Sequence, residues 1–424
     1  MSTVLHDAYT NLSTQAAALY RALGRTPVAA VTPEMAAAML GLACSDAEGL
    51  LEQLVTAHLA DEVEGRYRQH DLVRLHAHGL ERDVQGERAE LDGLVAYLTA
   101  GLQAAELTLT PSHHGHLPTP DAEILPPDLR PRLADEASAL AWCDQVKDEI
   151  PRVVHICVAR GMHAQVVELV HLNWPVFLRL GTARIELLDL ALDAARALQD
   201  EEAVAMFQTG RPSPLRAAER YDEALAAAAE AEAIYTRLVD QRGRSQALNA
   251  KAKTFRAMGR FEEAWALHER VRSLRTQAGY ARGVGLTLLE LGNVALDLVH
   301  LPVALEYYEE ARRILIEQLS AAAREPDVYD GTIAAIGAAR VRGLLGQSET
   351  ALSELEAADA SMRERGSRYG RGLAAEARGD VHARAGETSS ALAAYRAALE
   401  CYESTDPAGV ARMCRIIGAT APAV

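Results

Sequence analysis

The chain has 424 residues, of which 49% are apolar and only 5% aromatic, so its core must be built mostly from Ala, Leu and Val. Acidic side chains outnumber basic ones by 59 to 43, and the formal charge of −16 disfavours binding to nucleic acid or to an anionic membrane surface. The five cysteines form no CxxC pair, and no apolar run approaches the roughly 20 residues that span a bilayer, so a disulfide framework, a zinc ribbon and a membrane span are not expected.

The N-terminal segment MSTVLHDAYT has no basic stretch followed by an apolar one, which predicts no signal peptide and a cytoplasmic location. Helices are then expected over Leu12–Ala22, Thr32–Leu40 and Asp46–His58, with Thr32 as N-cap and Pro33 at the first helical position.

A short hairpin is expected next, with Leu59–Val63 pairing with Arg66–Gln69 across a turn at Glu64-Gly65. Three helices and a small hairpin are the outline of a winged helix. Over residues 1–90, however, 13 acidic side chains stand against seven arginines and no lysine. Because DNA contact needs cations opposite the phosphates, we expect a packing domain here and no DNA reader.

The middle of the chain contains few regular signals. The stretch Thr108–Arg132 holds six prolines and predicts an irregular linker. It also holds three histidines (His113, His114 and His116), but a flexible loop positions metal ligands poorly. Residues 136–200 carry amphipathic segments punctuated by Gly161 and Gly181, which predict divergent helix pairs. Glu168 and His171 have the spacing of half a di-iron site, but the second half is missing, so no metal site is expected.

The rest of the chain is a repeat. An alanine recurs at spacings of 40, 40, 47 and 40 residues, and a second small or modest apolar residue follows seven positions later. The first set is Ala224, Ala264, Ala304, Ala351 and Ala391, and the second is Ala231, Val271, Ala311, Ala358 and Ala398. Small residues at fixed positions are what two helices need in order to cross 8–10 Å apart.

Each of these helices (helix B) should follow a partner (helix A), as at Leu248–Met258, Leu286–Leu298 and Leu373–Ala385. Glycines suited to positive φ punctuate the A-to-B turn in three copies, at Gly259, Gly346 and Gly386. The first A helix would cross Gly210–Pro214, whose two prolines exclude regular helix. The longer 47-residue spacing predicts a loop at Ala323–Gly331.

These features resemble the tetratricopeptide repeat, whose small helix-A residue appears as Ala252, Gly292, Ala339 and Gly379. We therefore expect an all-α protein, with a small winged-helix-like N-terminal domain followed by a right-handed α-solenoid of tetratricopeptide repeats. The predicted domains are 1–90 (winged-helix-like), 91–135 (helix and Pro-rich linker), 136–210 (divergent helix pairs) and 211–424 (tetratricopeptide repeats).

The N-terminal part also contains sequence runs that resemble a known family. The runs Tyr20–Leu23, Leu51–Val55 and above all Gly65–Ala77 (GRYRQHDLVRLHA) resemble the winged-helix segment of actinobacterial AfsR-type regulators, and Ala139–Gly181 resembles their next stretch. That family, of the STAND class, joins a nucleotide-binding NB-ARC ATPase, a winged helix and tetratricopeptide repeats. A GxxxxGK[ST] loop is missing here and no lysine precedes Lys147, so the resemblance implies the sensor half without the ATPase.

The inner face of the solenoid is the expected binding site, because A helices line the groove of tetratricopeptide proteins. Asn side chains pair with peptide N–H and C=O groups, and Arg or Lys can hold a carboxylate. The family register gives Asn249, Lys253, Arg256, Glu290, Asn293, Asp297, Arg340, Glu376, Asp380 and Arg384 as the peptide- or protein-binding residues.

The sequence thus favours a non-catalytic regulatory or adaptor protein that captures a protein segment or peptide, in transcriptional or secondary-metabolite regulation, with no cofactor and no metal. One alternative is a DNA-binding, peptide-responsive transcription regulator. Another is an accessory protein or enzyme of a biosynthetic pathway with a site in the solenoid. The sequence leaves a homodimer open.

Overall fold

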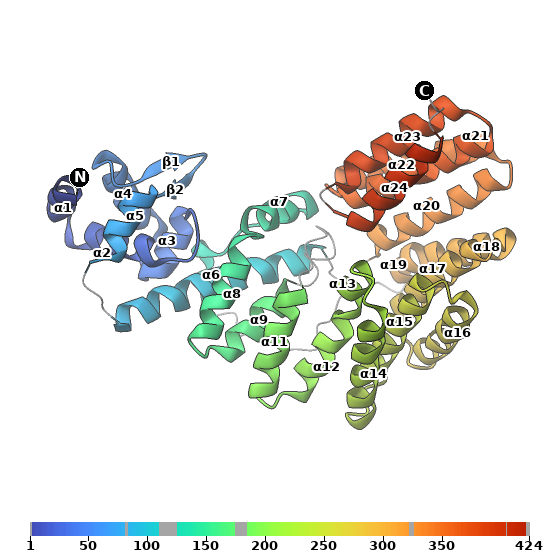
Figure 1. Cartoon of the computed structure of the whole chain (residues 1–424), viewed down its shortest axis with the longest axis horizontal. Coiled ribbons are helices and arrows are strands. Elements are labelled where there is room, and N and C mark those ends of the chain that lie inside the picture. Colours follow the sequence, from blue (N-terminus) through green and yellow to red (C-terminus); the bar gives the residue numbers. More distant parts are fainter. Residues whose placement is uncertain are drawn as a thin grey trace. The chain divides into compact units, whose positions relative to one another are not determined.

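The computed structural model describes residues 2–80, 84–109, 125–173, 185–321, 326–403 and 405–420. Within these ranges almost every element is a helix, which confirms the predicted all-α fold (Figure 1). None of the helices in these ranges is long and apolar enough to cross a membrane. The chain forms two compact units. The first comprises Met1–Thr108, Leu117–Ala134 and Ala141–Asn173, and the second comprises Leu109–His116, Asp135–Leu140 and Trp174–Val424.

The first unit begins with the three expected helices and the hairpin, together with two helices that were not predicted, one before them (α1) and one after them (α5). They are α1 (Ser2–Thr10), α2 (Thr14–Arg25), α3 (Pro33–Leu40), α4 (Cys44–Thr56), β1 (Asp61–Val63), β2 (Arg66–Arg68) and α5 (Asp71–His78). The Thr32 hydroxyl accepts a hydrogen bond from the Met35 N–H, as its predicted role of N-cap requires. The strands pair antiparallel, with Glu62 opposite Tyr67, so the predicted hairpin is present and slightly shorter than expected.

Further helices follow this winged-helix-like part: α6 (Val84–Leu109), the 3₁₀ turn η1 (Pro127–Leu129), α7 (Glu136–Val146), α8 (Glu149–Ala159) and α9 (His163–Leu172). A buried carboxylate ties α8 to the segment between α2 and α3, because both oxygens of Glu149 accept from the Ala29 N–H, at 3.3 and 3.2 Å. Much of the predicted linker, with its three histidines, and Gly181 lie outside the described residues. The four-part division into domains stays a prediction.

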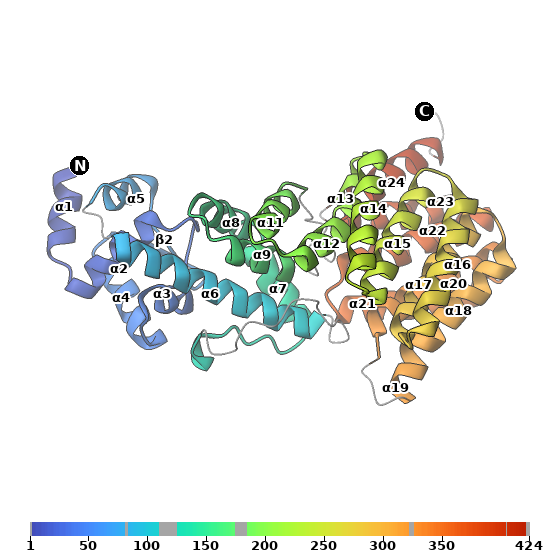
Figure 2. The ribbon, with the colours of Figure 1, turned by 90° about the horizontal axis from the view of Figure 1, so that it is seen from below.

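The second unit is a stack of helices, each packed on the next in chain order (Figures 1 and 2). They are α11 (Ile185–Ala197), α12 (Glu201–Gly210), α13 (Pro212–Ala217), α14 (Tyr221–Arg237), α15 (Gln241–Ala257), α16 (Phe261–Gln277), α17 (Ala281–Asp297), α18 (Leu301–Arg312), the π-helical η2 (Arg313–Gln318), α19 (Leu319–Ala321), α20 (Val328–Leu344), α21 (Ser348–Glu364), α22 (Arg368–Arg384), α23 (Thr388–Tyr402) and α24 (Pro407–Thr420).

The recurring small residues lie where the helices meet. All five alanines of the first set are 0% exposed, and the second set is equally buried apart from Ala358 at 5%. Large rings fill the gaps that glycines leave. A Cβ on Gly292 or Gly337 would lie 2.8 or 2.6 Å from the ring of Tyr308, so neither position has room for a side chain. The alanine and glycine pattern therefore sets the distance between neighbouring helices.

The predicted helix break and the predicted loop of the repeat region are each only partly confirmed. The helix does break at Gly210–Pro214, but only at Arg211, because Pro212 takes the first position of the new helix α13, where its missing N–H is harmless. The loop predicted at Ala323–Gly331 is too long. Helix α20 already begins at Val328, where Asp327 caps it by accepting from the Asp330 N–H. The extra residues of this repeat instead extend α18 through η2 and α19.

The predicted turn glycines adopt positive φ, at 74° for Gly259, 94° for Gly346 and 80° for Gly386. Val239 and Val299 hold the same left-handed conformation, at φ 58° and 61°, although they are 76% and 72% exposed. A β-branched residue is strained in this conformation, and removing so exposed a side chain gives up little buried apolar surface.

We therefore expect Val239→Gly and Val299→Gly each to raise the free energy of unfolding by about 1 kcal/mol in urea titrations, since relief of strain outweighs the greater chain entropy of glycine. Leu238→Gly, one residue away in the right-handed region, is the control and should give no gain. Equal stabilisation by all three substitutions would contradict the strain argument.

Candidate ligand-binding groove

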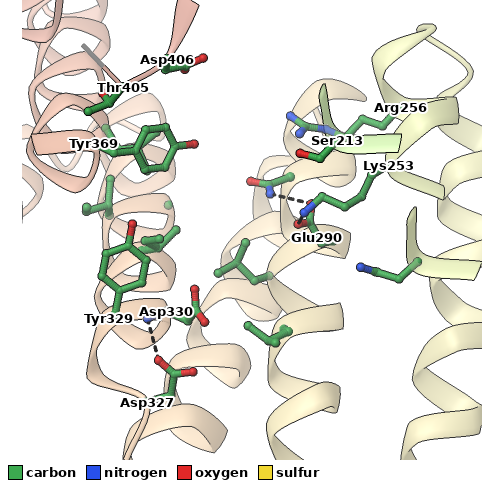
Figure 3. A pocket seen from close by; sticks show the side chains of 18 of the residues that line it. Ser213, Lys253, Arg256, Glu290, Asp327, Tyr329, Asp330, Tyr369, Thr405 and Asp406 are labelled. Atoms are coloured by element: carbon green, nitrogen blue, oxygen red, sulfur yellow. Dashed lines mark hydrogen bonds and ion pairs between the residues drawn. The ribbon is translucent and has the colours of Figure 1, made fainter. Parts of the chain in front are cut away.

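A cavity of about 1210 Å³ lies within the second unit (Figure 3). Its lining comes mainly from α13, α15, α17, α20 and α22 and the start of α24, and we call it the solenoid cavity. Eight of the ten predicted binding residues line it: Asn249, Lys253, Arg256, Glu290, Asn293, Asp297, Arg340 and Glu376. The other two, Asp380 and Arg384, are not part of the lining.

One wall is organised around a buried glutamate (Figure 3). Glu290 lies 2.6 Å from the Lys253 ammonium and accepts a hydrogen bond from the Asn293 amide at 3.3 Å. Tyr308 in turn donates to the Asn293 carbonyl oxygen at 2.7 Å. Burial alone would raise the pKa of Glu290, but the nearby cations, Lys253 first, hold it at about 2. The carboxylate is therefore ionised at neutral pH and belongs to an internal network.

Most other charges of the lining are also paired. Arg256 lies 2.5 Å from Asp297, and Arg340 lies 2.5 Å from Asp380. Glu376 accepts two bonds from Arg412, at 2.8 and 2.7 Å, and a third from the Tyr402 hydroxyl at 2.8 Å. These pairs join neighbouring repeats and hold the walls in place. They are the reason why Asp380 faces Arg340 and Tyr395 and not the open cavity.

Arg384 is placed differently again, because its Nε donates to the Leu344 carbonyl oxygen of the preceding A helix at 3.3 Å. The opposite wall (Figure 3) contains residues that the sequence did not single out: Tyr329 and Tyr369 from the first turns of α20 and α22, with Thr405 and Asp406 ahead of α24. These residues lie at or just before the starts of helices, whereas the residues expected from the family register lie in the middle of the A helices.

Several polar side chains of the lining, among them Ser213, Tyr369 and Asp406, make no hydrogen bond or ion pair with any described residue, and two others of this kind carry the argument below. One is the predicted Asn249, whose carbonyl oxygen is buried. The other is Arg216 on α13, which was not predicted because the two prolines of this segment argue against a helix. Burial, the largest effect, lowers the pKa of the Arg216 guanidinium to about 10, so it stays charged at neutral pH.

Neither a metal-binding cluster nor an activated thiol at Cys143 or Cys157 is found among the described residues. No group of three or more His, Cys, Asp or Glu side chains in them is arranged to hold a metal ion. Burial raises the thiol pKa of Cys143 to about 12 and of Cys157 to about 11, so neither is a reactive thiolate at neutral pH.

Paired helices with small residues at their crossings and polar A-helix faces around a cavity define a tetratricopeptide-like α-solenoid. No protein-family model matches the chain. The regulatory protein AfsR of Streptomyces coelicolor is 42% identical over 86 residues, which are 20% of this chain and 8% of that protein. The predicted similarity to AfsR-type regulators is thus confirmed over that stretch, and the match covers less than a tenth of the length of AfsR.

Two solved structures show weaker likeness. A STAND protein with a tetratricopeptide repeat sensor from Pyrococcus horikoshii is 15% identical, with a TM-score of 0.42 over 99% of this chain and 62% of that one. A Rap protein complexed with competence and sporulation factor is 13% identical, with a TM-score of 0.43 over 99% of this chain and 98% of that one. The description of the fold rests on the chain's own elements.

Proposed function

We propose that this chain is a non-catalytic regulatory or adaptor protein whose solenoid cavity binds a peptide or an extended segment of another protein. The similarity to a regulatory protein supports the first half of the proposal. The second half is supported by the cavity, which is lined by recurring helices whose polar side chains come from several repeats. In this proposal the paired charges shape the cavity, and the unpaired groups meet the ligand.

Asn249 is the observation that carries the proposal. A side-chain amide presents one acceptor and two donors in the geometry of a peptide group, so it can pair with both the N–H and the C=O of a bound backbone. A buried polar atom without a partner is unfavourable by about 1–3 kcal/mol. A peptide that satisfies the buried Asn249 oxygen recovers that free energy on binding.

We expect Asn249→Ala to weaken peptide binding about tenfold while leaving the free energy of unfolding unchanged or slightly higher, because no protein partner is lost. A pool of random decapeptides is incubated with the protein, retained peptides are identified by mass spectrometry, and their dissociation constants are measured by fluorescence anisotropy. Gln246→Ala is the matched control, since it removes an amide from the same helix that is not part of the lining.

Two results would contradict the proposal. The wild-type protein could retain no peptide at all, or the retained peptides could bind Asn249→Ala and the wild type equally well. The second result would place the binding surface outside the solenoid cavity.

A further inference from the structure

The charges of the solenoid cavity are unevenly distributed. Apart from Arg282, which is engaged by Asp327 and Asp330 of the opposite wall, the wall made by α13 to α17 holds four cations (Arg216, Lys253, Arg256 and Arg275) and two anions (Glu290 and Asp297). Lys253 neutralises Glu290, and Arg256 neutralises Asp297. Arg216 and Arg275 therefore have no carboxylate within ion-pair distance among the described residues, and this wall has an excess of two positive charges.

The two unmatched arginines differ in what they can still bind. Arg275 is 5% exposed and already donates to the Gly283 carbonyl and the Thr287 hydroxyl, at 2.9 Å each, and to the Ser245 hydroxyl at 3.2 Å. It is a fixed cation that raises the local potential. Arg216 makes no such bonds, so its guanidinium has donors free for a ligand.

The surroundings of Arg216 hold it at the cavity. Its helix α13 starts at Pro212 and is anchored by the buried Pro214 and Leu215. Ser213 of the same helix lies across from Lys253 and Arg256 (Figure 3). Helix α13 also packs on α15, the helix that carries the unpaired Asn249. Unpaired donors and one unpaired amide thus come together on a single wall.

The opposite wall has the opposite charge. Asp327 and Asp330 share one cation, Arg282 of α17, at 2.6 and 3.1 Å, and Asp406 lies beyond Tyr369 (Figure 3). The arginines of this wall add no unmatched positive charge, because each is paired with a carboxylate: Arg340 with Asp380, Arg365 with Glu136 and Arg412 with Glu376. An anionic group is repelled there and attracted to the wall of Arg216. A guanidinium binds a carboxylate through two parallel N–H···O bonds, which are stronger than bonds between neutral groups.

We propose that Arg216, with Ser213 and the Asn249 amide on the neighbouring helix, forms a carboxylate-binding subsite that anchors one end of the peptide in the solenoid cavity. The inference rests on the proposed function and specifies its ligand: a peptide with a free carboxyl terminus or an Asp or Glu side chain directed at α13. The two sources of carboxylate share one chemistry and are separated by experiment.

Three synthetic pools of random decapeptides provide the test. The first has free carboxyl termini and all residue types, the second is amidated at the terminus, and the third is amidated and lacks Asp and Glu. We expect the third pool to be retained at least about tenfold less than the first, as loss of a charge-assisted pair predicts. Retention of the second pool then assigns the carboxylate to a side chain, and its loss assigns it to the terminus.

Arg216→Gln should lower binding of the carboxylate-bearing peptides about tenfold, to the level of the third pool, and Arg216→Lys should fall between. The fold should tolerate both changes, since Arg216 bonds to no described residue. Arg260→Gln, which removes an exposed arginine paired with Glu263 outside the cavity, is the control and should bind like the wild type.

Equal retention of the first and third pools, or unchanged binding by Arg216→Gln, overturns the carboxylate subsite. If Asn249→Ala still weakens binding in that case, the proposed function stands without it. Failure of the wild type to retain any pool overturns both.

Discussion

Lys253→Met is expected to lower the free energy of unfolding by about 2 kcal/mol at pH 7, measured by urea titration with circular dichroism. The substitution leaves the ionised Glu290, which is 9% exposed, without its closest cation. Removing one partner of a fully buried ion pair is unfavourable by about 3–5 kcal/mol. The expected loss is smaller because the Lys253 side chain is 38% exposed, and Arg256 and Asn293 still face the carboxylate.

The loss should come from the uncompensated carboxylate and not from the missing lysine. Adding Glu290→Met to Lys253→Met should therefore restore about half of it or more, because the buried charge is removed as well. Lys251→Met, two residues away on the same helix and outside the lining, should leave stability unchanged. A Lys253→Met protein as stable as the wild type would show that the pair does not hold the wall together.

The second large effect is a loss of stability in mild acid that depends on His268. This histidine is 0% exposed, and neither ring nitrogen has a hydrogen-bond partner among the described residues. Burial lowers its pKa from the ordinary 6.5 to about 4, against the opposing attraction of Glu290. Below pH 6.5 His268 binds a proton in the unfolded chain but stays neutral in the folded chain. The folded state therefore loses stability as the pH falls from 6.5 towards 4, by about 2 kcal/mol at pH 5.

Urea titrations at pH 7.5 and pH 5 measure this effect. His268→Leu should remove most of the difference between the two pH values, and at pH 7.5 it should be close to neutral, because it replaces two unpaired nitrogens by an apolar side chain. His78→Leu, which changes an exposed histidine of the first unit, should keep the pH dependence of the wild type. If His268→Leu and the wild type lose the same free energy in acid, the histidine is not the source.

The sequence predicted the inner wall well because one rule governs it. Small residues at a fixed interval set where helices cross, and the crossing fixes which face of each A helix points inward. This is why Asn249, Glu290, Asn293 and Glu376, from different repeats, line the same cavity.

The misses have local causes. Arg216 lies in a repeat whose two prolines were expected to exclude an A helix, yet Pro212 starts α13 instead of ending a helix. Arg275 belongs to a B helix, which the register assigns to the outer layer. It reaches inward because Gly283 has no side chain, and a Cβ there would lie 3.0 Å from the Arg275 Cδ.

The sequence also could not show which polar groups are already paired. Asp380 has the right register but is engaged by Arg340 and Tyr395, while Asn249 is not engaged at all. That distinction depends on side-chain geometry between repeats 40 residues apart, which a helical period does not encode. It is also the distinction on which the proposed function depends.

Photo-crosslinking tests the central proposal most directly. A decapeptide retained by the wild-type protein is resynthesised with a benzophenone side chain near its middle, irradiated in the complex, and its attachment sites are mapped by mass spectrometry. Ligand capture in the solenoid cavity predicts attachment to the inner helices α15, α17 and α20. Attachment confined to the B helices α14 and α16, or to α4 of the winged-helix-like part, would contradict it.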